Sequence, residues 1–176
     1  MTSQVQALLA DGKLTGSWVL DGTRSSVRLT SKSMWNMAKV KGTFGQVTGA
    51  GTVSAAGEAA GTITVAAASI DTKIKKRDAH LRSADFFDVE KYPEISFRAT
   101  SVTLSGQTAA ASGTLTVRDQ SRPVTISGTV AEHGADEISL DAEMAVNRGD
   151  YGMSYNQLNM MSLDNIITIH AVFTKA

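Results

Sequence analysis

The chain has 176 residues, with 17 Lys or Arg, 17 Asp or Glu and no cysteine, so its formal net charge is zero. This balance provides no global attraction to nucleic acid or to an anionic membrane. The lack of cysteine excludes disulfides, thiolate metal sites and cysteine nucleophiles. A chain of this length has the size of one domain and buries about 70% of its unfolded surface.

The first residues show no targeting pattern. Residues 1–10 contain no Lys or Arg, and their short apolar run is interrupted by Gln6, which is unlike a signal peptide. No run approaches the roughly 18 apolar residues that span a bilayer. We therefore expect a cytoplasmic protein, with residues 1–15 as a short lead-in that includes a helical turn over residues 4–10. Residues 16–176 then form one domain.

From Gly16 onward, apolar and polar residues alternate in short runs, which is typical of strands with one buried face. Turn-forming pairs such as Ser105-Gly106 and His133-Gly134 separate these runs. Many short strands with regular turns predict an all-β fold, and closure into an extended antiparallel eight-stranded barrel removes exposed sheet edges. Residues 49–68 are rich in Gly and Ala, which suits a tapered part of the sheet.

One segment departs from the strand pattern. Ile74, Asp78, Leu81 and Asp85 lie at helical spacing, which predicts a short helical crossover near residues 74–85. Asp71 or Thr72 is the expected cap. The Phe86-Phe87 pair at its end is expected to enter the barrel.

A barrel of about eight strands leaves room for one small ligand. Large or soft side chains are the candidate lining, because methionine in particular adapts to irregular apolar ligands. The alternative is that they fill an ordinary core. The candidates are Trp35, Met37, Phe44, Phe86, Phe87, Met144, Tyr151, Met153, Met160 and Met161.

Charged residues of the crossover suggest a second kind of site. Arg77, His80 and Arg82 are candidates for holding a charged head group, since arginine suits phosphate oxygens. The alternative is a structural ion-pair network that ties the crossover to the strand ends. The three histidines fit no metal spacing, and the chain has no nucleophile elbow and no phosphate-binding glycine loop. We therefore expect no metal, no cofactor and no catalysis.

Several segments resemble the YceI-like family of polyisoprenoid-binding proteins. The most specific is the run over residues 77–97, RDAHLRSADFFDVEKYPEISF, which follows Ser-Ile-Asp-Thr at residues 69–72. Weaker matches lie at residues 40–45, 113–117 and 147–153. The resemblance implies a lipocalin-like barrel that binds a polyisoprenoid, an isoprenoid quinone or a fatty-chain lipid in its interior, as carrier or store.

The chain departs from the family pattern at three places. Arg24 and Ser25 stand where relatives usually have His-Ser, residues 119–121 read Asp-Gln-Ser, and residues 155–161 are rich in Met and Asn. We expect these departures to alter the pocket mouth.

Two other functions remain open. One is an enzyme acting on an isoprenoid or a quinone, with a titratable pair facing the interior. The other is a stress-related structural barrel with a packed interior. Pairing of an exposed strand with its copy would give a homodimer, which the sequence allows without establishing it.

Overall fold

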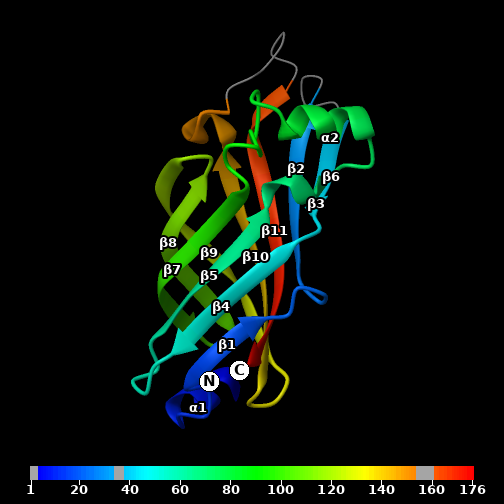
Figure 1. The fold of residues 1–176 in the computed structure, drawn as a ribbon. Coiled ribbons are helices and arrows are strands. Elements are labelled where there is room, and N and C mark those ends of the chain that lie inside the picture. The colour runs from blue at the N-terminus through cyan, green and yellow to red at the C-terminus, as the bar shows by residue number, and fades with distance from the viewer. Residues whose placement is uncertain (1–3, 34–37, 154–160) are drawn as a thin grey trace.

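The computed structural model describes the whole chain except residues 1–3, 34–37 and 154–160, and only the backbone of residues 32, 33, 38, 161 and 162. Most of the described residues belong to the strands of one antiparallel sheet (Figure 1). The strands are β1 (Gly16–Leu20), β2 (Ser26–Ser33), β3 (Ala38–Phe44), β4 (Val47–Val53), β5 (Ala59–Ala66), β6 (Ile70–Asp71), β7 (Glu94–Ser105), β8 (Thr108–Val117), β9 (Gln120–Glu132), β10 (Glu137–Asn147) and β11 (Met161–Lys175).

The sheet closes into an eight-stranded barrel because three of its strands are each built from two pieces. β1 and β2 both pair with β11, β3 pairs with β2 while β4 pairs with β1, and β6 and β5 pair with β3 and β4 in turn. Each strand lies beside the next in chain order, and β11 returns to the first. The predicted fold class is confirmed.

The period of two in the sequence separates the inside of the barrel from the outside. In β10, Ala142 is buried, whereas its neighbours Asp141 and Glu143 are exposed. The inward side chains of the other strands join the same apolar core cluster. The hydrophobic effect thus drives closure, because apolar residues on every strand lose contact with water together.

Short helices cover both ends of the barrel. Helix α1 (Gln4–Ala10) lies at what we call the lower end, close to both chain termini (Figure 1). Helix α2 (Lys75–Arg82) and the 3-10 turn η2 (Arg148–Tyr151) lie at the upper end. A further 3-10 turn, η1 (Ala67–Ser69), joins β5 to β6.

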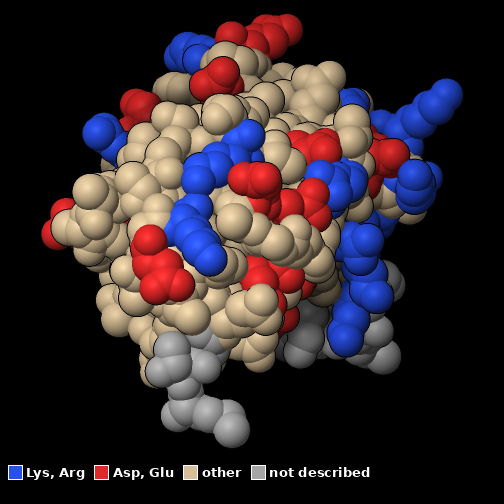
Figure 2. All heavy atoms as spheres, turned by 90° about the horizontal axis from the view of Figure 1, so that it is seen from below, with Lys and Arg blue, Asp and Glu red and all other residues tan. Residues whose placement is uncertain are grey.

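Seen from below, the surface carries both signs of charge close together, with positive side chains along its right-hand edge (Figure 2).

The helical crossover is present, but the expected cap is wrong. Helix α2 begins after Ile74, and no side chain caps its first turn. The relation runs the other way: the Asp78 carboxylate on the helix accepts hydrogen bonds from the backbone N–H and the hydroxyl of Thr72, at 2.9 and 2.5 Å. Lys73 has a positive φ of 70°. This bend folds the chain back, so that Thr72 lies beside the helix rather than at its start.

A bulge bends β7 where β8 carries a glycine. Ala99 pairs with Gly113 and Ser101 with Ser112, so Thr100 is an extra residue in β7. A Cβ atom on Gly113 would overlap the carbonyl oxygen of Arg98. The two strands therefore approach at this point only because residue 113 lacks a side chain.

We expect Gly113→Ala to lower the free energy of unfolding by about 1–3 kcal/mol, the usual cost of forcing extra atoms into a packed region. Urea denaturation followed by circular dichroism measures it. Ser112→Ala, at the exposed neighbouring position, is the matched control. Equal stability of the two variants would contradict the close approach.

Candidate functional site

The interior of the barrel contains two cavities. The upper cavity has a volume of about 160 Å³ and the lower one about 240 Å³. A single water molecule needs roughly 10–15 Å³ on the same kind of measure. Side chains therefore leave far more space than the small defects of an ordinary packed core.

The two cavities lie end to end along the barrel. Ile63, Phe97 and Ile169 line both of them, so these three side chains mark the boundary at the waist. The upper cavity extends from there to α2, and the lower one to α1. Together they form an apolar interior that runs most of the length of the barrel.

The upper cavity contains five of the ten lining residues expected from the sequence: Phe44, Phe86, Phe87, Met144 and Met153. Phe86 and Phe87 are buried, and the ring of Phe87 meets that of Phe44 edge to face at 5.8 Å between centroids. The segment after α2 thus places two aromatic rings inside the barrel.

The other five candidates do not join this lining. Tyr151 is buried, and burial raises the pKa of its phenol, but it lies outside the described lining of both cavities. Trp35, Met37 and Met160 lie outside the described residues, as does the side chain of Met161.

Sequence reasoning missed most of the aliphatic lining and the whole lower cavity. Leu29, Val146 and Ile167 line the upper cavity, and the alternating pattern had already placed such residues on the inward face. Part of the lining of the lower cavity consists of small residues of β4 and β5, such as Gly51, Ala60 and Gly61. The Gly- and Ala-rich composition of residues 49–68 was the signal for it.

Polar side chains line the upper cavity near α2. They are Ser31, Thr72, Arg77, His80, Ser96, Arg148 and Asn165. The walls of both cavities are mostly apolar, but the charged residues of the described lining, Arg77 and Arg148, and the histidine His80 all belong to the upper cavity, at the end away from α1.

Arg77 and Arg82, two of the head-group candidates, take different positions. Arg77 lines the cavity while its Nε and Nη2 donate to the hydroxyl and the carbonyl of Thr72, both at 2.8 Å. Arg82 lies outside the described lining and donates to the carbonyl oxygens of Ala68 and Ile70, at 2.9 and 3.0 Å. Both arginines thus attach α2 to the chain before it, Arg77 through the hydroxyl and the carbonyl of Thr72 and Arg82 through two carbonyl oxygens.

His80, the third candidate, also faces the upper cavity. Its Nε2 lies 2.8 Å from a carboxylate oxygen of Asp85, and its ring meets that of Phe86 edge to face at 5.0 Å. The side chain remains 41% exposed, so this residue lies where the cavity meets solvent.

Arg148 is a cavity residue that the head-group prediction missed. It is only 6% exposed, its Nη1 donates to the carbonyl of Met153 at 2.6 Å, and its guanidinium lies 5.4 Å from the centre of the Phe86 ring. Burial lowers the pKa of its guanidinium. A desolvated cation beside an apolar cavity is a strong potential donor to an oxygen-rich group.

Further arginines hold the turn that carries Arg148. Arg122 donates to the carbonyl of Asp150 at 2.7 Å, and Arg118 donates to that of Gly152 at 3.0 Å. Gly152 has a φ of 80°, which ends η2 and turns the chain towards Met153. These bonds connect η2 and the residue after it to Arg118 and Arg122, just after the end of β8 and in β9.

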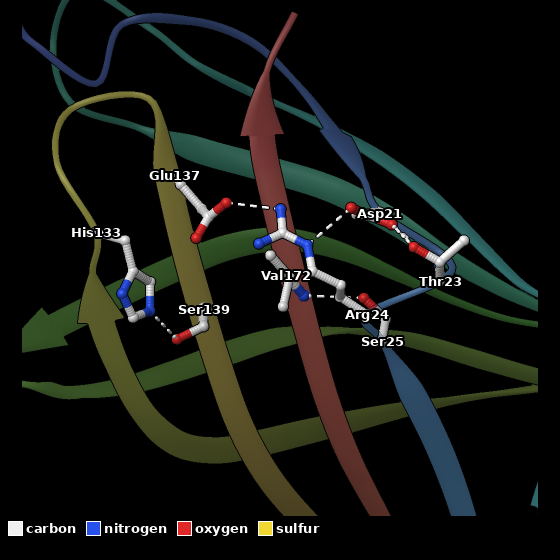
Figure 3. Close-up of polar contacts among 8 residues, drawn as sticks. All are labelled: Asp21, Thr23, Arg24, Ser25, His133, Glu137, Ser139 and Val172. Atoms are coloured by element: carbon white, nitrogen blue, oxygen red, sulfur yellow. Dashed lines mark hydrogen bonds and ion pairs between the residues drawn. The ribbon is translucent and has the colours of Figure 1, made fainter.

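Arg24 and Ser25 do not lie at the mouth, which corrects the expectation for this departure from the family pattern. They belong to the loop between β1 and β2 and are outside the described lining of both cavities. Arg24 reaches across β11 and pairs with Asp21 at 2.9 Å and Glu137 at 2.6 Å, while the Ser25 hydroxyl accepts from the N–H of Val172 (Figure 3). Their role is to hold the barrel closed.

The remaining histidines have polar partners away from the cavities. His133 Nε2 lies 3.2 Å from the Ser139 hydroxyl, and His170 Nδ1 lies 2.6 Å from Asp141 (Figure 3 shows the first pair). Among the described residues, no group of three or more His, Asp or Glu is placed to hold a metal ion.

Removing the Asp78 carboxylate is expected to destabilise the upper end. In Asp78→Ala, the buried N–H and hydroxyl of Thr72 lose their acceptor, which costs about 1–3 kcal/mol of unfolding free energy. Asp85→Ala removes an exposed pair with His80 and should cost at most about 1 kcal/mol. Urea denaturation of both variants tests the difference. A smaller loss for Asp78→Ala than for Asp85→Ala would show that the Thr72 contact is dispensable.

The contacts of Asp21 with Thr23 and Arg24, in the loop between β1 and β2, are expected to respond to acid. Hydrogen bonds from Thr23 and then Arg24 lower the pKa of Asp21 from 3.8 to about 2. A carboxyl whose pKa is lower in the folded state stabilises the fold above its unfolded pKa. This contribution is lost as the pH falls from 3.8 towards 2. Asp21→Asn should therefore show a weaker dependence of unfolding free energy on pH in this window.

Denaturant titrations at several pH values measure that slope. Glu58→Gln, in the turn between β4 and β5, controls for the loss of one exposed carboxylate. An unchanged slope in Asp21→Asn would rule out a contribution of the Asp21 contacts to acid stability.

Comparison with known proteins gives relatives along most of the chain. The UPF0312 protein of Pseudomonas putida strain GB-1 is 33% identical over 144 residues, which cover 77% of this chain and 75% of the relative. Protein YceI of Escherichia coli O157:H7 is 37% identical over 120 residues, which cover 64% of this chain and 62% of the relative.

In the described residues, no helix is long and apolar enough to cross a membrane.

Solved structures share the fold. BcnA of Burkholderia cenocepacia superposes with a TM-score of 0.79 at 22% identity, covering 87% of this chain and 98% of its own. A structure described as a polyisoprenoid binding domain from Saccharophagus degradans gives a TM-score of 0.76 at 16% identity, covering 90% and 98%. The YceI-like domain matches residues 18–174. The chain belongs to the YceI-like domain family.

Proposed function

We propose that this protein binds a long-chain apolar or amphiphilic molecule inside the barrel, as carrier or store. The ligand is a polyisoprenoid, an isoprenoid quinone or a fatty-chain lipid. The observation that carries the proposal is the pair of apolar cavities that lie end to end, with polar side chains gathered at one end.

The size of the cavities supports the binding of a ligand, because empty apolar space of this volume destabilises the fold. Unfilled apolar space costs about 24 cal/mol per Å³, so cavities of about 160 and 240 Å³ cost several kcal/mol if they remain empty. Burying a chain of about ten methylene-sized groups would gain about 8 kcal/mol before the cost of association. A long apolar chain that fills the cavities would therefore offset the free-energy cost of leaving them empty.

The polar end suits a head group that accepts hydrogen bonds. Arg77, Arg148 and His80 line the upper cavity beside Thr72, and they offer donors to a hydroxyl, carbonyl or phosphate oxygen. The resemblance of the fold to a structure described as a polyisoprenoid binding domain supports the same ligand class.

The alternatives have less support. A structural barrel predicts a packed interior, and the two cavities favour the binding function over it. An enzyme acting on the same lipids predicts a titratable pair facing the interior. Of the two residues that we would expect to serve turnover, His80 faces the upper cavity, whereas Tyr151 is buried outside both described linings.

Filling the upper cavity tests the proposal. Val146 faces the cavity, whereas its neighbour Ala145 is exposed on the outside of the same strand. We expect Val146→Phe to keep or raise the melting temperature, because cavity filling is commonly stabilising. Binding of farnesol or a short-chain ubiquinone should weaken at least tenfold, as measured by quenching of tryptophan fluorescence and by native mass spectrometry.

Ala145→Phe adds the same ring outside the barrel and should leave binding unchanged. The proposal would be overturned if the wild-type protein took up neither ligand saturably and released no lipid on solvent extraction. It would also be overturned if Val146→Phe, well folded, bound as tightly as Ala145→Phe.

A further inference from the structure

Most residues that line the lower cavity lie outside the sequence motifs that resemble the family; Phe97, at the end of the run over residues 77–97, is an exception. We infer that the lower cavity holds the far end of the ligand's apolar chain, and that α1 with Trp18 forms its floor. The floor then sets the longest chain that the barrel accepts. This inference rests on the proposed function and adds the length selectivity of the same interior.

The lower cavity is chemically suited to the end of a hydrocarbon chain. Its described lining contains no charged residue, and Thr52 and Thr62 are the only residues with a hydroxyl in that lining. Much of its wall consists of Gly or Ala, so the space is wide where the upper cavity is narrowed by phenylalanines. A head group would lose its hydrogen bonds here. The chain therefore enters tail first and leaves its polar end near α2.

The N-terminal segment closes this cavity from below. Val5 and Leu9 of α1, with Leu14 and Trp18 after it, line the cavity floor. Val5, Leu14 and Trp18 are 3–5% exposed and form a second core cluster, separate from that of the barrel interior. Apolar burial thus holds the helix across the end of the barrel.

Hydrogen bonds keep this floor in place. The Trp18 indole N–H donates to the carbonyl of Leu14 at 2.9 Å, and the Lys175 ammonium at the end of β11 donates to the carbonyl of Lys13 at 2.7 Å. Gln6 on α1 donates to the carbonyl of Leu104 on β7 at 3.4 Å. Hydrogen bonds thus connect the N-terminal segment to β11, β7 and β1.

The floor also lies mostly outside the domain that relatives share. The YceI-like domain matches residues 18–174, so Val5, Leu9 and Leu14 precede it. A chain-length limit built from these residues would rest mainly on residues that precede the matched domain.

Binding of a series of prenols tests the inference. Geraniol, farnesol, geranylgeraniol and longer all-trans homologues would be added to the full-length protein, and binding followed by native mass spectrometry and by displacement of a fluorescent fatty acid. We expect affinity to rise with chain length up to a limit and then fall. Leu9→Ala and Trp18→Ala should move that limit to longer prenols, because each removes part of the floor.

A variant that fills the same cavity should act in the opposite direction. Ala111→Leu adds three carbons to the wall and should weaken binding of the longest prenol accepted by the wild type at least tenfold, with geraniol unaffected. Ile74→Ala, at an exposed site near α2, is the control. Melting temperatures identify any variant that fails to fold, and Leu9 is only half-buried, so its truncation is the milder of the two.

The outcomes separate the inference from the function on which it rests. Binding of prenols with the same length limit in Leu9→Ala, Ala111→Leu and the wild type would overturn the inference alone. Failure of every prenol to bind the wild type would overturn the proposed function and the inference with it.

Discussion

The double pairing of β11 is the constraint on which the rest of the structure depends. One edge of this strand pairs with β10, and the other edge pairs with β1 and then β2. Arg24 and Ser25 hold the loop between those two pieces against β11 (Figure 3). Closure places the inward side chains of all strands in one compartment away from water. Without it, the apolar faces would form an open sheet with no enclosed interior.

Closure alone does not make the two ends of the interior different. The residues at each end do. The upper rim is held by arginines that donate to backbone carbonyls, and two of these, Arg77 and Arg148, also face the cavity. The lower end is sealed by apolar side chains of α1. Under the proposed function, a molecule with a polar head and an apolar tail would lie in this interior with its head near α2. The same residues that stabilise the ends thus define how a ligand would lie.

The relation to the family separates shared from individual features. The barrel over residues 18–174 is the YceI-like domain, and the run over residues 77–97 supplies α2 and the two phenylalanines that line the upper cavity. Arg24 and Glu137 form an outer ion pair beside β11. Helix α1 lies outside the matched domain. The N-terminal residues that line the lower cavity therefore lie mostly outside the matched domain.

The sequence by itself determined the strands, the crossover and the inward side chains, because the direction of a side chain follows from the local period of two. It also identified Phe86 and Phe87, an aromatic pair that follows the short helix. Only the tertiary structure decided that the interior stays partly empty and that Arg148 and Trp18 belong to opposite ends of it. It also decided that Thr72 donates to Asp78 within α2 and does not cap the start of that helix. Whether a space is filled depends on side chains that face one another across the barrel, far apart in the chain. Their register is decided by closure of the whole sheet and not by any local pattern.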